Sequence, residues 1–301
     1  YLACNLGFSA AMLNPFTVGI AQSIAGIQLY SGVEFRTLVW FVSTLVGCGF
    51  VMFYAMKIKK NPELSPMFEH DQVKREKLKS TESEQTEFTL RHKIIIASLF
   101  VSIALVVYGV LKLEFWIPQI AAIFLGLGII SGLVGKLAPN EIAEAFTDGA
   151  KDMIGAAIMI GLAKSVMIIA QNANIIDTIL FNLANVVGQL PSLIASYIMF
   201  VIQMFINFFV SSGSGQAALT MPILAPLGDL VGISRQLSVL IYQLGDGFSN
   251  AMFPTSGVLI ACLGMAGVPY GKWLKWILPL QAILFMTAIV FITIASLIGW
   301  A

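Results

Sequence analysis

Residues 247–257 read GFSNAMFPTSG and residues 7–17 read GFSAAMLNPFT, and each segment interrupts a long apolar stretch. The two stretches, 236–262 and 1–29, are long enough to cross a bilayer as helices. Each nevertheless carries proline, serine, threonine and an asparagine at mid-depth. Such breaks are tolerated in lipid only where the freed backbone faces protein or a wet cavity. Both stretches are therefore predicted to be broken transmembrane helices.

The two breaks are copies of one motif. At an offset of 240, residues 7–30 and 247–270 are identical at nine of 24 positions, clustered at the breaks. The matches are Gly7/Gly247, Phe8/Phe248, Ser9/Ser249, Ala11/Ala251, Met12/Met252, Val18/Val258, Ile20/Ile260, Ala21/Ala261 and Tyr30/Tyr270. Paired interrupted segments indicate a secondary transporter with inverted repeats. The alternative is ordinary kinks in packed membrane helices; the recurrence of polar residues beside proline favours the repeat.

The composition is that of a membrane protein with one charged, solvated loop. The chain is 58% hydrophobic and 11% charged, with a mean hydropathy of +0.87, whereas soluble domains are about a quarter charged. Nine basic and seven acidic residues lie in 57–93. The net charge of +1 offers no basic surface for nucleic acid. The three cysteines stand apart and both histidines lie in the charged loop, so no metal or disulfide cluster is expected.

The predicted fold is an all-α polytopic membrane protein. Full spans are expected at 35–56, 94–111, 117–137, 153–170 and 274–299. Between them, 192–232 is expected to form a re-entrant hairpin, because the apolar run 193–210 stops at a polar tip, 211–216, and resumes at 217–231. The predicted division is 1–56 as the end of the first inverted repeat, 57–93 as a linker, and 94–301 as the second repeat. Because Tyr1 opens inside a hydrophobic stretch, we expect a segment to precede it.

The basic residues predict the orientation in a bacterial inner membrane. A cytoplasmic 57–93 puts thirteen basic residues inside and only Arg36, Lys112 and Arg235 outside. The hairpin returns to its own side, so the two broken helices run in opposite directions through the membrane. The mixed-charge segment 140–152 is expected to lie along the cytoplasmic interface, and 172–189 along the outer one.

The polar residues at the breaks and the tip are the candidate ligands. An interrupted helix presents free backbone N–H and C=O groups, so it can hold an anion and a cation. The candidates are Ser9, Asn14, Pro15 and Thr17 in the first break; Ser211, Ser212, Gly213, Ser214 and Gln216 at the tip; and Ser249, Asn250, Pro254, Thr255 and Ser256 in the second break. Among them, Ser211, Ser212, Asn250 and Thr255 are the expected Na⁺ ligands.

Asp246 is the acid placed deepest beside a break, and a carboxylate at membrane depth costs about 3 kcal/mol. It could bind a coupling ion, cycle a proton or hold a substrate ammonium; alternatively it is a structural partner of a neighbouring amide such as Gln243. Lys164, in the span 153–170, could pair with Asp246 or Asp229, neutralise a substrate carboxylate, or snorkel to an interface. The run 211–215 lacks the lysine of a phosphate loop.

The pair NFFVSSGSGQAALTMPILAPLGDLVG (207–232) and YQLGDGFSNAMFPTSGVLIA (242–261) resembles the DcuC/YfcC family of four-carbon-dicarboxylate carriers and their basic amino acid antiporter relatives. The resemblance implies a homodimer that moves its transport domain by an elevator-type step. It also implies an ion site between the tip 211–216 and the break 249–257, and a first hairpin facing 9–17. The first break has Ala10 where the second has Asn250, so the two sites need not be equivalent.

We therefore expect a secondary transporter, a symporter or an exchanger, for a small carboxylate-bearing metabolite. Asp246, and the lack of an arginine at either break, favour an amino acid, a basic one included, over a four-carbon dicarboxylate. Na⁺ or H⁺ is the expected coupling ion, and no other cofactor is expected. A channel would need a continuous polar pore face. A membrane-embedded enzyme would need a catalytic set at depth, and the spans contain no histidine and no paired acids.

Overall fold

The computed structural model describes residues 1–72, 76, 88–113, 115, 117–175, 178, 182 and 185–300. The chain forms two compact units, one of residues 1–68 and 155–301 and the other of residues 69–154. Every regular element in the described ranges is a helix. Part of the linker 57–93 therefore lies outside the described residues, as does part of the segment 172–189.

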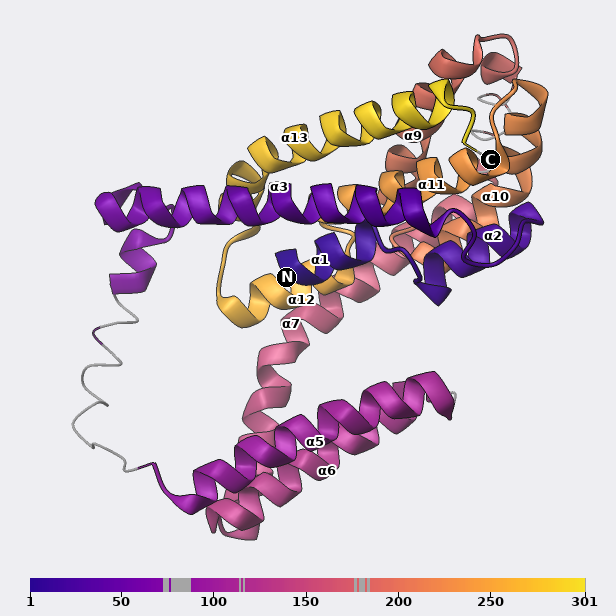
Figure 1. Cartoon of the computed structure of the whole chain (residues 1–301). Coiled ribbons are helices and arrows are strands. Elements are labelled where there is room, and N and C mark those ends of the chain that lie inside the picture. Colours follow the sequence, from indigo (N-terminus) through magenta and orange to yellow (C-terminus); the bar gives the residue numbers. More distant parts are fainter. Residues whose placement is uncertain are drawn as a thin grey trace. The chain divides into compact units, whose positions relative to one another are not determined.

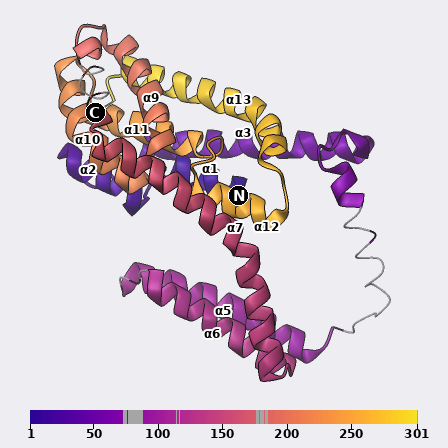
Figure 2. The ribbon, with the colours of Figure 1, turned by 180° about the vertical axis from the view of Figure 1, so that it is seen from behind.

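The larger unit contains both broken helices, the hairpin and two long helices (Figure 1). Its elements are α1 (Leu2–Ser9), the π-helix η1 (Pro15–Gly19), α2 (Ile20–Ala25), α3 (Val33–Lys60), the short η2 (Pro62–Leu64), α9 (Ser192–Phe209), α10 (Gly213–Leu230), α11 (Arg235–Ser249), α12 (Gly257–Ala266) and α13 (Tyr270–Leu297). The smaller unit contains α5 (Leu90–Lys112) and α6 (Ile117–Gly135), which lie side by side in both views (Figures 1 and 2).

Among the described residues, four helices are long and apolar enough to cross a membrane: α3, α6 over Pro118–Gly135, α9 and α13. The predicted spans 35–56 and 94–111 lie within α3 and α5, whereas the span predicted to end at 299 ends at Leu297, the last residue of α13. The span predicted to end at 137 ends at Gly135, because Lys136 takes a left-handed conformation (φ 62°) that closes the helix.

One expected boundary is wrong. A separate interfacial segment at 140–152 was predicted before a span at 153–170, but α7 runs without interruption from Pro139 to Asn172. Pro139 is suited to the first position of a helix, and no second proline follows in that range to stop it. The boundary between the two compact units falls inside this helix, between Ile154 and Gly155.

The long helices α3 and α13 pack antiparallel through aromatic side chains. Phe35 contacts Phe291 at a centroid distance of 5.9 Å, and Phe50 contacts Trp276 at 5.2 Å. The residue numbers of these contacts rise along α3 as they fall along α13, so the two helices run in opposite directions. This pair lies beside α11, whose residues 236–249 are all buried.

The hairpin folds back beside α11. Asn207 of α9 bonds to Ser249, and a Cβ at Gly245 would meet Gln203, so α9 and α11 run in the same direction. Along α10 the contacts reverse, with Gly213 beside Tyr242 and Gly228 beside Ser238. The turn itself is shorter than expected. Only residues 210–212 are non-helical, because Gly213 to Gln216 form the first turn of α10.

The duplicated serines are both the last residues of helices. α1 ends at Ser9 and α11 ends at Ser249, 240 positions later. The helices resume as η1 at Pro15 and as α12 at Gly257. Both second halves end at a glycine in the left-handed region, Gly26 (φ 68°) and Gly267 (φ 64°), where a residue with a side chain would be strained.

Candidate functional site

Asp246 is the carboxylate of the candidate site. It lies one turn before the end of α11 and is 0% exposed. Neither of its carboxylate oxygens accepts a hydrogen bond from the residues that the structure describes. Gln243, the amide considered as its structural partner, bonds instead to Arg36 and to the carbonyl of Ala11. Because a buried carboxylate without a partner is costly, this arrangement favours a ligand site over a structural role.

The hairpin tip lies against both the second break and Asp246. The Ser211 hydroxyl donates to the carbonyl oxygen of Thr255 at 2.6 Å, and the Tyr242 hydroxyl donates to that of Gly213 at 2.6 Å. A Cβ built on Gly213 would lie only 3.3 Å from Asp246 Oδ2. Because Gly213 has no side chain, the Asp246 carboxylate directly faces the first turn of α10.

The first break reaches the same point through Thr17. A Cβ on Gly213 would also lie 2.6 Å from Thr17 Cγ2 and 3.1 Å from the ring of Phe8. Thr17 is 1% exposed, and its hydroxyl has no hydrogen-bond partner among the described residues. The tip, the first break and Asp246 thus meet at one buried place.

The glycines that flank Asp246 have a different role from the one expected. They were predicted to leave backbone room beside the carboxylate, but neighbouring helices occupy that room. A Cβ on Gly245 would lie 2.5 Å from Gln203 Cβ, and one on Gly247 would lie 2.3 Å from the Cα of Ser9. These glycines let α9 and α1 approach α11 closely.

Several other buried oxygens near the breaks lack partners. Besides the Asp246 carboxylate, they are Asn5 Oδ1, Thr17 Oγ1, Asn207 Oδ1, Gln216 Oε1 and Thr255 Oγ1. Buried polar atoms are normally paired, so a group of unpaired ones needs an explanation. Gln203 Nε2, on the amide that bonds to Gln216, is unpaired as well, so Gln216 belongs to an amide pair. The other oxygens have free lone pairs and suit a hard cation or the proton of a ligand.

The serines and Asn250 close the ends of the broken helices. Ser9 Oγ donates to Asn5 O at 2.5 Å, Ser249 Oγ donates to Gly245 O at 2.6 Å, and Asn250 Nδ2 donates to Asp246 O at 3.0 Å. Of these three carbonyls only that of Asp246 is among the last four of its helix, which can lack an intrahelical partner. The Ser9 and Ser249 hydroxyls add a second bond to the carbonyl four residues earlier.

Some of the remaining predicted residues lie at the site, and others stabilise the helix ends around it. Asn14 Oδ1 accepts the Phe16 N–H at 2.9 Å, and Pro15 is exposed, so both shape the first break. Ser212 caps α10 by accepting the Gly215 N–H at 3.4 Å. Gln216 donates to Gln203 of α9 and not to the second break, since it belongs to the helix rather than to the turn. Ser214 and Pro254 are half-buried, and Ser256 is buried where α12 begins.

Sequence reasoning missed three residues that hold the site together. Asn207 Nδ2 donates to Asp246 O at 2.9 Å and to Ser249 Oγ at 2.7 Å. Asn5 Nδ2 donates to Gly247 O at 3.1 Å, and the Tyr242 hydroxyl holds the tip. A signal for Asn207 exists, because Ser196, Gln203 and Asn207 recur at helical spacing in the apolar run 193–210.

The structure does not test the predicted pairing of Lys164 with Asp246, and it gives Asp229 another partner. Asp229, near the end of α10, pairs at 2.8 Å with Arg235, the first residue of α11, and both side chains are half-exposed. Among the described residues Asp246 forms no ion pair. The side chain of Lys164 lies outside the described residues, as does Asp177.

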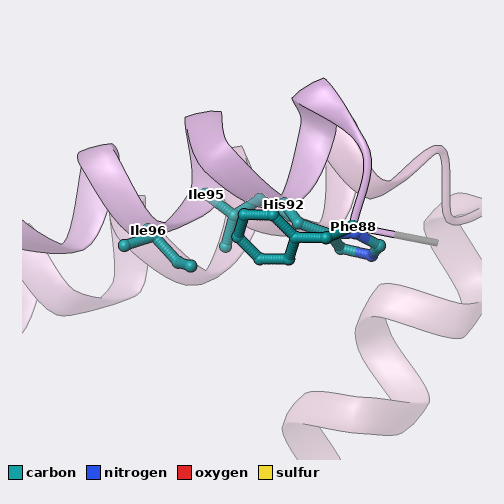
Figure 3. Close-up of a pocket in the computed structure, with 4 residues that line it drawn as sticks. All are labelled: Phe88, His92, Ile95 and Ile96. Carbon is teal, nitrogen blue, oxygen red and sulfur yellow. The ribbon is translucent and has the colours of Figure 1, made fainter. Parts of the chain in front are cut away.

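Other sites in the described part are weak candidates. No group of three or more His, Cys, Asp or Glu that could hold a metal occurs there. A hollow at the start of α5 is lined by Phe88, His92, Ile95 and Ile96 (Figure 3). The Phe88 ring stacks on His92 at 5.8 Å, and His92 Nδ1 accepts the Thr89 N–H at 3.1 Å. These contacts cap a helix and bring no further polar group together.

The comparisons place the chain in a family of carriers. The family model described as C4-dicarboxylate anaerobic carrier (DcuC) matches residues 1–297. The chain belongs to the DcuC family. It is 41% identical to the Escherichia coli protein named "Putative basic amino acid antiporter YfcC", an alignment that covers 100% of the chain and 61% of that protein. It is 33% identical to an uncharacterized protein of Haemophilus influenzae, over 95% of the chain and 56% of the relative. No solved structure matches.

The chain spans about three-fifths of the curated DcuC-family relatives that it matches. Membership of a carrier family, together with four helices long enough to cross a membrane, identifies an all-α membrane protein. The family description is that of a carrier and not of an enzyme.

Proposed function

We propose that this chain is part of a secondary active transporter of the bacterial inner membrane. It carries a small carboxylate-bearing metabolite and couples its movement to Na⁺ or H⁺. The observation that supports this most is the buried Asp246 carboxylate, which has no partner at the meeting point of the hairpin tip and the first break. The DcuC family description supports the same class of function.

The coupling cation binds at Asp246. Thr17 and Asn207 each have an unpaired oxygen close to it, since Gly213 adjoins both Thr17 and Asp246 and since Asn207 bonds to the Asp246 carbonyl. Of the expected Na⁺ ligands, Thr255 contributes an unpaired hydroxyl, and Ser211 keeps its lone pairs because it donates its proton. Oxygen atoms alone form such a shell, which a dehydrated alkali cation accepts and a transition metal does not favour.

The two broken helices are inverted repeats. Tyr1 bonds to Asn250, Asn5 to Gly247, and Gln22 to Gln236, so numbers rise along the first copy while they fall along α11. Two equivalent segments that run in opposite directions are what a pseudo-two-fold axis in the membrane plane requires. The hairpin re-enters from the outer side, and the segment 57–93 lies in the cytoplasm.

The substrate is an amino acid, a basic one included, or a four-carbon dicarboxylate. The E. coli relative's name refers to basic amino acids, and the family description refers to dicarboxylates. An ammonium group would pair with Asp246, whereas a second carboxylate would be repelled by it. We favour an amino acid for this reason, carried by an elevator-type movement in a homodimer.

The test is uptake by the full-length protein in proteoliposomes, with labelled L-arginine and labelled succinate as separate probes. Asp246→Asn is expected to reduce uptake at least about 100-fold while leaving the melting temperature and the yield unchanged. Asp229→Asn, which alters only a half-exposed surface pair, is the matched control and is expected to transport normally. Normal transport by Asp246→Asn across pH and Na⁺ concentrations would refute the cation role. Flux without counterflow would identify a channel.

A further inference from the structure

Arg36 is a buried positive charge that the site described above does not use. It lies in the first turns of α3 and is 1% exposed, although its sequence position had assigned it to an outer loop. The ion pairs in the described part of the chain are Lys151–Asp148 and Arg235–Asp229, so Arg36 is in neither. A buried arginine without an acidic partner among the described residues is costly, so its burial needs an explanation.

Neutral groups surround the guanidinium. Nη1 donates to Gln243 Oε1 at 2.8 Å, and Nη2 donates to Gln236 Oε1 at 3.2 Å. The Trp300 ring lies 5.3 Å from the guanidinium carbon, and Nε has no acceptor. Amide oxygens and an aromatic face lower the free-energy cost of burying the guanidinium, but they carry no negative charge that would neutralise it.

Gln243 connects this charge with the site. Arginine only donates, so the Gln243 oxygen must face Arg36 and its NH₂ must face the opposite way. That NH₂ donates to the carbonyl of Ala11, inside the first break, at 2.6 Å. Gln243 also precedes Asp246 by three residues on α11, so the two side chains share one side of the helix. Arg36 thus acts on the first break and on Asp246 without touching either.

Resting on the proposed function, we propose that Arg36 is the fixed charge that makes the cation-loaded site accept a carboxylate. Without ligands, Arg36 and Asp246 balance each other. A cation bound at Asp246 leaves one net positive charge in a buried region, where net charge is costly. The carboxylate group of a substrate at the first break offsets this positive charge locally, so binding of the cation favours binding of the carboxylate group. Arg36 is in this sense a positioning residue that sets specificity.

The role of the Arg36 charge is tested by measuring how much each ligand stabilises the detergent-solubilised full-length protein. The probes are Na⁺ alone and then, at fixed Na⁺, L-arginine against L-argininamide and succinate against succinamide. Arg36→Met is expected to weaken binding of the carboxylate probe at least about tenfold, which corresponds to about 1.4 kcal/mol. It should leave the Na⁺ affinity unchanged or higher, because a repelling charge has been removed. Arg36→Lys retains the charge and should stay within about threefold of the unmodified protein.

Gln243→Glu has nearly the same volume and sets a carboxylate against Arg36, so it neutralises the charge even if Arg36→Met fails to fold, although it also removes the donor to the Ala11 carbonyl. It should weaken carboxylate binding about tenfold as well. Unchanged carboxylate affinity in either neutralised variant would overturn the inference, as would equal loss of Na⁺ and carboxylate binding in Arg36→Met and Arg36→Lys, which would indicate a structural role. If the unmodified protein itself binds neither carboxylate probe, the proposed function fails instead.

Discussion

Gly247 is the position where a single added methyl group tests the contact between the two breaks. A Cβ there would lie 2.3 Å from Ser9 Cα, 2.5 Å from Ser9 Cβ and 2.8 Å from Ser9 Oγ. Carbon atoms pack at about 3.5–4.0 Å, so α1 and α11 would have to separate by about 1 Å. The close neighbour is backbone, which cannot rotate away as a flexible side chain could.

The expected cost of Gly247→Ala follows from three opposing effects. Overpacking costs about 1–3 kcal/mol, and separation weakens the 3.1 Å bond from Asn5 to the Gly247 carbonyl by about 1 kcal/mol. The higher helix propensity of alanine returns about 1 kcal/mol. We therefore expect a net loss of about 1–3 kcal/mol in the free energy of unfolding, with weakened ligand binding because Asp246 is the adjacent residue.

Gly7→Ala is the matched control. Gly7 is the repeat equivalent of Gly247 and is also helical, but a Cβ there would meet nothing within 4 Å. This variant should gain about 0.5–1 kcal/mol from helix propensity alone. Thermal unfolding of the purified full-length variants measures both effects. A Gly247→Ala protein as stable as Gly7→Ala would refute the close backbone contact and the pairing of the breaks.

Three further predictions concern the frame of the site and the orientation. Asn207→Ala should lower the free energy of unfolding by about 1–3 kcal/mol, because two buried acceptors each lose one of their hydrogen bonds; an unchanged melting temperature would contradict this. Tyr242→Phe should cost about 1 kcal/mol and weaken cation binding, since the Gly213 carbonyl loses its bond; titration with Na⁺ measures it, and unaltered affinity would count against the tip as part of the site. A cysteine substituted for the exposed Glu63 should not react with an impermeant thiol reagent in intact cells but should react after lysis. Labelling in intact cells would contradict the predicted cytoplasmic position of this segment.

The positions of the breaks were accessible from sequence, because proline, serine and asparagine leave a pattern that lipid-facing helices lack. Ser9 and Ser249, the duplicated residues, are where α1 and α11 end. The depth of Asp246 was accessible for a related reason, since a lone acid in an apolar stretch is expensive. The extent of the hairpin tip could not be predicted from the sequence. Gly213 to Gln216 look like a loop by composition, but Ser212 caps them into a helix.

What the sequence could not supply are contacts between residues that are distant along the chain. Arg36 was assigned to an outer loop because a helix boundary near a charge cannot be judged from one sequence. Its burial depends on Gln236 and Gln243, which lie 200 and 207 positions away. The glycines beside Asp246 were read as empty space for a similar reason, because Gln203 and Ser9 approach from other helices.

The bond between Asn5 and Gly247 spans 242 positions, and this separation has a consequence for biogenesis. A ribosome adds about 5–20 residues each second, so α11 emerges roughly 10–50 s after α1. During that interval the free backbone groups of the first break have no α11 to pair with, and each unsatisfied group costs several kcal/mol in hydrocarbon. The newly inserted first break must therefore wait in water or against another protein segment. A delay in synthesis between residues 30 and 235 would lengthen the time in which the nascent chain is open to degradation.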